Sequence, residues 1–169
     1  EAKDTLTLEE RIDHHYLTGI ATIEATYENV DRVLKEFKDF FTSPISKKQT
    51  KYKTFVISGT NQPNKIRGLV NLLKLNKIEF GFLSSNKSKS VKNAYEYLTG
   101  EKKTIKVSNK DICIPIDQKL GILANVLFEP KTNLSDTLTY DITAWSLPYI
   151  YGLDAYALEN NLKLELKDT

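Results

Sequence analysis

One long apolar stripe at helical spacing dominates the first quarter of the chain. Its large apolar residues follow one another at steps of three or four positions, the period of an amphipathic helix: Leu8, Ile12, Tyr16, Ile20, Ile23, Tyr27, Val30, Leu34, Phe37 and Phe41. Thr7 and Glu10 form a predicted capping box at its start, and Pro44 ends it. An unbroken helix over 8–41 would be about 50 Å long. Because a compact domain of this size is narrower, we expect a break near Gly19 or a projecting end.

The length of the stripe predicts two parts in the chain. Residues 1–44 are expected to form a long N-terminal helix that can link to another domain, and residues 45–169 an α/β domain. Each large apolar side chain left in water forgoes about 1.5–3 kcal/mol of burial, so the stripe implies a surface that covers it. We expect the half around Phe37 to pack on the sheet, and the half around Ile12 and Tyr16 to meet another domain or a second copy.

Two apolar runs on either side of a helical segment predict a βαβ unit. Residues 51–58 and 78–83 are strand-like, and the helix between them begins near Pro63 and can close at Asn76 in a left-handed conformation. Such a unit makes its two strands parallel neighbours. The sequence therefore predicts a three-layer, flavodoxin-like α/β fold with a mostly parallel sheet.

Weaker local signals fill in the rest of this domain. Residues 91–98 are expected to form one or two helical turns, and residues 104–107 and 112–116 to form a hairpin. Short helices are expected after Asp117 and Asp141. A strand is expected at 155–158, and the alternating leucines at 162, 164 and 166 indicate either a final edge strand or the start of a linker.

The composition excludes several partners. Lys and Arg total 24 against 22 for Asp and Glu, a net charge of +2, which is too even to indicate nucleic acid. The apolar runs are shorter than the ~20 residues of a membrane span, and no signal-peptide pattern is found. The chain starts at Glu1 and contains no methionine, which favours a piece of a longer protein.

The residues that commonly carry catalysis are scarce. His14 and His15 are the only histidines, and neither has the neighbours of a zinc-peptidase motif. Cys113, the only cysteine, alternates with two isoleucines and has no histidine downstream to activate it. We therefore expect no metal, no cofactor and no catalytic residue in this part of the protein, and a buried structural role for Cys113.

The turn after the first strand is a candidate binding site. Gly59, Thr60 and Asn61 follow a strand and open a helix, a position where parallel sheets bind small anions or peptides. An ordinary turn is the competing interpretation.

Aromatic residues crowd a short segment near the C-terminal end. Tyrosine and tryptophan suit both a core edge and an interface, and both interpretations stay open for Tyr140, Trp145, Tyr149 and Tyr151.

The chain resembles one family most clearly between 128 and 153. This segment is similar to the region that follows the catalytic domain in large secreted bacterial zinc carboxypeptidases of the carboxypeptidase A-like family. The matching residues include Phe128-Glu129-Pro130-Lys131-Thr132, the run from Asp136 to Tyr149, and Tyr151-Gly152-Leu153, with looser matches at 11–16, 93–95, 99–100, 114–115 and 118. In that family, this region is similar to a class I glutamine amidotransferase-like module without amidotransferase chemistry.

The resemblance implies a role outside the chemistry itself. It suggests a non-catalytic accessory domain that braces the catalytic domain of a secreted or periplasmic zinc peptidase or shapes access to it. The parent would hold zinc and be a hydrolase, but none of the family's zinc ligands or catalytic residues can be placed here. The implied partner is the parent's own catalytic domain, with a homo-oligomer as a further possibility. The alternative function is a small-ligand or peptide binding module with its site at Gly59–Asn61.

Overall fold

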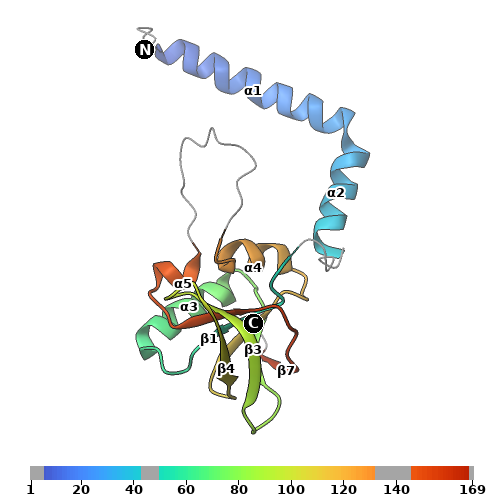
Figure 1. Ribbon diagram of the computed structural model, residues 1–169. Helices are drawn as coiled ribbons and strands as arrows, with labels where there is room; N and C mark the ends of the chain where they lie inside the picture. Colours follow the sequence, from blue (N-terminus) through green and yellow to red (C-terminus); the bar gives the residue numbers. More distant parts are fainter. Residues whose placement is uncertain (1–5, 43–49, 132–145, 168–169) are drawn as a thin grey trace. The chain divides into compact units, whose positions relative to one another are not determined.

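The computed structural model describes residues 6–42, 50–131 and 146–167. The chain divides into two compact units, residues 1–43 and residues 44–169, here named the helical unit and the sheet unit. Figure 1 shows the elements of each unit in the colours of the sequence.

The helical unit contains two helices, α1 (Leu8–Glu28) and α2 (Val30–Thr42). The predicted capping box is confirmed: the Thr7 backbone N–H donates to Glu10 Oε2 at 2.8 Å, and the Glu10 N–H donates to Thr7 Oγ1 at 3.3 Å. These two bonds satisfy donors that the first helical turn leaves without partners.

The break between the helices lies at Asn29 rather than near Gly19. The Asn29 side chain donates to the carbonyl of Ala25 at 2.8 Å and its backbone N–H donates to the same oxygen at 3.2 Å. Asparagine competes with the helix in this way because its short amide reaches nearby backbone groups. Gly19 lies inside α1 and does not interrupt the helix.

The sheet unit is built on a seven-stranded sheet with the order β4-β3-β6-β1-β5-β2-β7. Every pair of neighbours in it is antiparallel. The strands are β1 (Thr54–Ile57), β2 (Phe80–Leu83), β3 (Lys89–Glu96), β4 (Lys102–Val107), β5 (Ile112–Pro115), β6 (Ala155–Leu158) and β7 (Leu164–Lys167). The helices are α3 (Pro63–Leu75), α4 (Gly121–Phe128) and α5 (Leu147–Ile150).

The prediction of a three-layer, mostly parallel, flavodoxin-like or amidotransferase-like sheet is wrong. β1 and β2 do run in the same direction, but β5 lies between them and pairs antiparallel with both. β1 is buried along its whole length. A central antiparallel strand covered on both faces has the same continuous apolar character as a parallel strand, so the sequence pattern could not separate the two.

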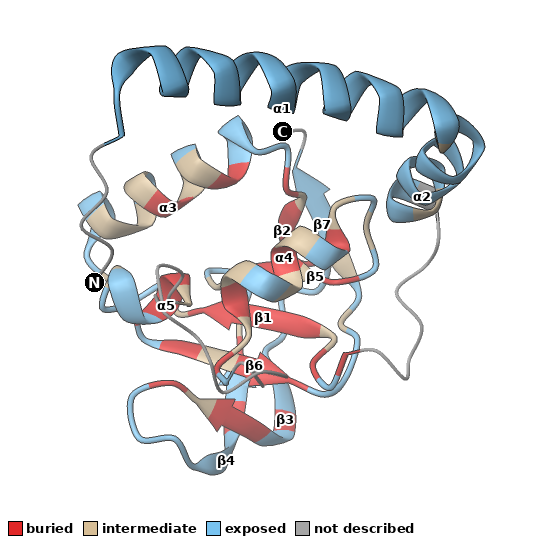
Figure 2. Cartoon of the chain, turned by 90° about the horizontal axis from the view of Figure 1, so that it is seen from above, coloured by how far each residue is buried: buried red, intermediate tan, exposed pale blue. Residues whose placement is uncertain are grey.

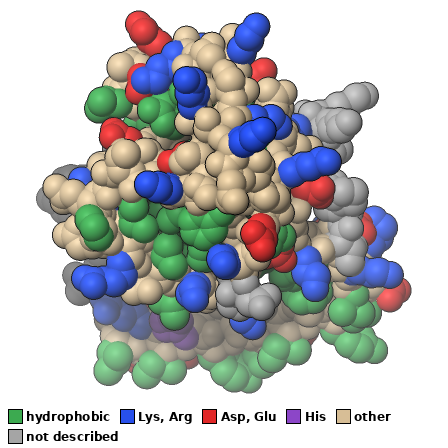
Figure 3. All heavy atoms as spheres, turned by 90° about the horizontal axis from the view of Figure 1, so that it is seen from below, with side chains coloured by type: hydrophobic (Ala, Val, Ile, Leu, Met, Phe, Trp, Pro, Cys, Tyr) green, Lys and Arg blue, Asp and Glu red, His purple; other side chains and the backbone are tan. Residues whose placement is uncertain are grey.

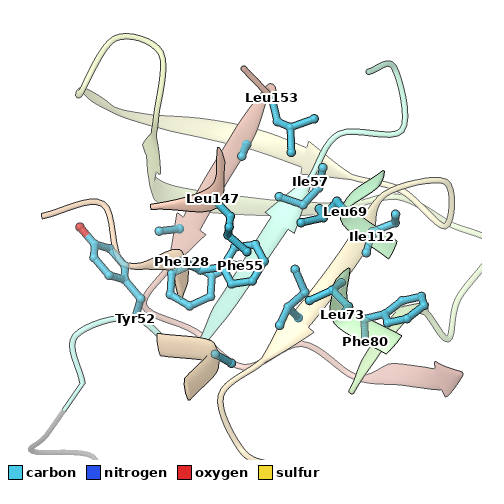
Figure 4. Close-up of a cluster of buried hydrophobic side chains, with 14 of the residues drawn as sticks. Tyr52, Phe55, Ile57, Leu69, Leu73, Phe80, Ile112, Phe128, Leu147 and Leu153 are labelled. Atoms are coloured by element: carbon cyan, nitrogen blue, oxygen red, sulfur yellow. The ribbon is translucent and has the colours of Figure 1, made fainter. Parts of the chain in front are cut away.

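One face of the sheet holds the main core. α3, α4 and α5 pack there, and Leu69, Leu73 and Leu147 join the buried side chains of β1 and β5. Phe55 of β1 stacks on Phe128 of α4 with ring centroids 5.5 Å apart, and Figure 4 shows the two rings side by side. Figure 2 shows the burial along these strands, in contrast with the exposed surface of α1.

The opposite face is buried by the sheet itself. Val56 and Cys113 in the sheet centre belong to one apolar cluster with Ile105 and Val107 of β4. β4 is one of the two edge strands, three places from β1 in the sheet order, so the β3–β4 end must curl over this face. A register shift in β3 beside Asn93, whose φ is +58°, supplies the bend, because a bulge increases local twist.

Several local predictions are confirmed and others are wrong. The helix beginning at Pro63 and the strands at 155–158 and 164–167 are present. Residues 91–98 lie largely in β3 rather than in a helix. β4 and β5 do not form a hairpin, because β4 pairs with β3. Lys77, not Asn76, adopts the left-handed conformation after α3, with φ +54°.

Candidate functional site

The predicted binding turn, Gly59–Asn61, joins β1 to α3 and is held by its own side chains. Asn61 Nδ2 donates to the carbonyls of Ser58 at 2.8 Å and Asp154 at 3.0 Å, and Asn61 Oδ1 accepts the Asp154 N–H at 2.9 Å. The Thr60 hydroxyl lies 2.8 Å from that of Ser58. Asn61 therefore bridges the end of β1 to the start of β6.

Gly59 contacts the turn that precedes β5 and is hydrogen-bonded to it. Its backbone N–H donates to Asp111 Oδ1 at 2.8 Å. The other oxygen of Asp111 accepts the Ser108 N–H at 2.7 Å and the Ser108 hydroxyl at 3.0 Å. A Cβ at Gly59 would collide with the carbonyl of Lys110. The Asp111 carboxylate thus takes the donor that an anion would need, and glycine is required because two backbones meet here.

Two hollows flank this turn. The smaller, of about 220 Å³, lies on the curled face between the sheet centre and β4, and its polar lining includes Ser58, Asp111 and Tyr156. The larger, of about 580 Å³, lies on the helical face. It is named the α3 groove here and is lined by Gly59, Ile66, Val70, Lys74, Phe80, Phe82, Lys110, Ile112 and Lys167.

Sequence reasoning did not identify the α3 groove. Ile66 and Val70 are spaced as neighbours on the apolar face of a helix, and a face of this kind is ordinarily covered. Both stay only half-buried in the structure. The groove depends on which strands lie beneath α3, and no local pattern carries that information.

Cys113 is fully buried in the cluster on the curled face. Burial is the main cause that raises the pKa of its thiol to about 12, and the Asp111 carboxylate adds to the shift. The thiolate is the nucleophilic form, so this environment disfavours reactivity. His14 and His15 are exposed on α1. Within the described residues, no cluster of three or more His, Cys, Asp or Glu side chains could hold a metal ion.

The Cys113 thiol is expected to resist alkylation in the folded chain. Iodoacetamide at neutral pH should leave it unmodified and should label it fully once denaturant unfolds the protein, because both access and thiolate are lacking in the native state. Intact-mass spectrometry measures the added group. Rapid labelling without denaturant would show that the curled face opens readily.

The predicted interface residues are found in both units or lie outside the described residues. Ile12 and Tyr16 are 60% and 67% exposed on α1. Tyr149 is 42% exposed and meets Tyr97 edge to face at 5.2 Å between centroids, and burial is the main cause that raises its pKa to about 12. Tyr151 is half-buried. Tyr140 and Trp145 lie outside the described residues.

Comparisons of this chain with protein-family models, with curated proteins and with solved structures found no match. Much of the segment that carries the resemblance to zinc carboxypeptidases, residues 132–145, lies outside the described residues. Among the described residues, none of the helices combines the length and the apolar character that crossing a membrane requires.

Proposed function

We propose that this chain is a non-catalytic accessory module that binds another protein domain through the apolar stripe of its helical unit. The observation that carries the proposal is the exposure of that stripe. No described residue of α1 is buried, and Ile12, Tyr27 and Phe37 are 60%, 83% and 66% exposed.

The energetics favour a partner for these helices. A continuous row of apolar side chains in water forgoes about 1.5–3 kcal/mol for each large residue. Helices also gain most of their stability from packing of an apolar face rather than from intrinsic propensity. A surface that covers the stripe would therefore stabilise the two helices as it binds them.

The charges of α1 restrict the kind of partner. Its acidic residues, Glu9, Glu10, Asp13, Glu24 and Glu28, outnumber its one basic residue, Arg11. An apolar surface with a basic rim suits such a helix, whereas an anionic lipid surface repels it. The resemblance makes the catalytic domain of a secreted zinc carboxypeptidase the proposed partner, with this chain as its brace.

The alternative function, a small-anion site at Gly59–Asn61, has less support. The Gly59 N–H already binds Asp111, and the Asn61 amide already bridges two segments. An anion at this turn would have to displace a carboxylate of the chain itself.

Hydrogen exchange of the full chain tests the proposal. Residues 8–42 of the dilute monomer should exchange their amide hydrogens quickly, and should become protected when a purified carboxypeptidase A-like catalytic domain is added and binds. Strong protection of 8–42 in the monomer alone would mean that the chain covers its own stripe, and the proposal would fail.

An Ile12→Asp substitution is expected to weaken association through the stripe by about tenfold or more, because a buried charge without a partner is strongly unfavourable. His14→Asp is the matched control, since it introduces a negative charge on the opposite side of α1. Sedimentation equilibrium measures self-association and calorimetry measures binding of the catalytic domain. Equal effects of the two variants would contradict a role for the stripe.

A further inference from the structure

The α3 groove has an apolar floor and one apolar wall. Phe80 and Phe82 of β2 and Ile112 of β5 form the floor, and Ile66 and Val70 of α3 form the wall. The wall residues lie one helical turn apart, and the distance along α3 from Ile66 to Lys74 is about 12 Å at 1.5 Å per residue. The groove is therefore as long as a little over two turns of helix. The space-filling view in Figure 3 shows a face of the molecule with hydrophobic side chains gathered near its middle and basic side chains around them.

The layer of helices stops short of this end of the sheet. α3 buries Leu69 and Leu73, and α4 places Phe128 over Phe55 in the sheet centre. Beyond α3 lie β2 and the edge strand β7, where Phe82 remains only half-buried. Helices pack at about 8–10 Å from one another, and one further helix beside α3 would complete the layer.

Positive charge lies at both ends of the groove. Lys110 stands beside Gly59 and Ile112 at one end. Lys167 is opposite Phe80 in the β2–β7 register, and Lys74 lies in the last turn of α3, at the other end. Within the described part of the chain, these three lysines have no ion-pair partner. Two acidic residues lie near the groove without lining it: Glu165 on β7, opposite Phe82, and Asp111, whose carboxylate accepts the Gly59 N–H.

We propose that the α3 groove binds an amphipathic helix of a partner protein that carries acidic residues near both ends of its apolar face. The apolar face would cover Phe80, Phe82 and Val70, and the acidic residues would meet Lys110 at one end and Lys74 and Lys167 at the other. Docking of a helix into an apolar groove is a common form of peptide recognition. A single-headed fatty acid fits less well, because its one carboxylate would leave the basic residues at the other end unused.

Fluorescence anisotropy with two synthetic amphipathic peptides tests the proposal on the full chain. Both peptides span about four helical turns, near the shortest length at which isolated helices form in water, and share the same leucine face. One carries two glutamates about eight residues apart, which matches the length of the groove at 1.5 Å per residue, and the other carries lysines at these positions. The glutamate peptide should bind about tenfold more tightly at low salt, with the difference shrinking as salt screens the charges.

Charge-reversal variants locate the site. Lys74→Glu should weaken binding of the glutamate peptide by about fivefold or more, and Lys167→Glu by a similar factor. Lys92→Glu is the matched control, because Lys92 is an exposed lysine on β3, four places from β2, and it should change binding by less than about twofold. Lys74, Lys167 and Lys92 are all exposed, so the three variants should keep the fold. Thermal melting checks this.

Three results would overturn the proposal. One is equal binding of the two peptides, and another is an equal effect of Lys92→Glu and Lys74→Glu. The third is binding of laurate, added below its micelle-forming concentration, by a chain that ignores both peptides, which would make the occupant a lipid anion. Failure of the helical stripe to bind a partner would leave these outcomes unchanged, because the groove belongs to the sheet unit.

Discussion

Replacing Phe128 with alanine is expected to lower the free energy of unfolding by about 3–5 kcal/mol, as large truncations in a core do. Phe128 is fully buried and its ring stacks on Phe55 at the centre of the main core. The Tyr97 hydroxyl also donates to the Phe128 carbonyl, so α4 is fixed at this residue by both its side chain and its backbone. Removing the ring leaves a cavity between α4 and β1.

Urea unfolding followed by circular dichroism measures this loss. Leu98→Ala is the control, because Leu98 is 79% exposed and its truncation should change stability by less than about 0.5 kcal/mol. A loss at Phe128 no larger than the loss at Leu98 would mean that α4 does not pack on the sheet as described.

Replacing Gly59 with alanine is expected to destabilise the sheet unit by about 1–3 kcal/mol, the usual range for overpacking. The added Cβ would collide with the Lys110 carbonyl, which belongs to backbone and cannot rotate away as a side chain could. The turn would have to move and would weaken the bond from the Gly59 N–H to Asp111.

Gly19→Ala is the matched control for this substitution. No atom lies within 4 Å of a Cβ built at Gly19, and alanine favours a helix interior over glycine by about 1 kcal/mol. Thermal melting should therefore show a loss for Gly59→Ala and none for Gly19→Ala. An unchanged melting temperature for Gly59→Ala would contradict the close contact between the Gly59 turn and the turn that contains Lys110 and Asp111.

The parts of the candidate sites that depend on local contacts could be predicted from the sequence, and the parts that depend on distant contacts could not. The sequence correctly placed Gly59 and Asn61 in a turn between a strand and a helix. It could not show that the Gly59 N–H would bind the Asp111 carboxylate, or that the Asn61 amide would bind the Asp154 carbonyl, because both partners lie far along the chain. The α3 groove was invisible for the same reason, since its floor comes from β2 and β5 and one of its lysines from β7.

The resemblance to the module after a zinc-peptidase domain led the fold prediction astray. It implied an amidotransferase-like parallel sheet, and the βαβ spacing of residues 51–83 agreed with it. Only the βαβ spacing is compatible with β5 lying between β1 and β2, because β1 and β2 run in the same direction whether or not an antiparallel strand separates them. The peptidase partner stays a proposal that rests on the resemblance and on the exposed stripe, and the binding experiment tests it.

Features that depend on a few neighbouring residues could be predicted from the sequence alone. The capping box at Thr7 and Glu10, the start of α3 at Pro63 and the alternating edge strand β7 follow from hydrogen bonds and periodicity within one element. Contacts between distant parts of the chain set the antiparallel order of the sheet and the curl of β3 and β4 over its second face. This division arises because a strand's own residues fix its length and its buried faces, whereas its partners depend on packing and hydrogen bonding with residues far away in the chain.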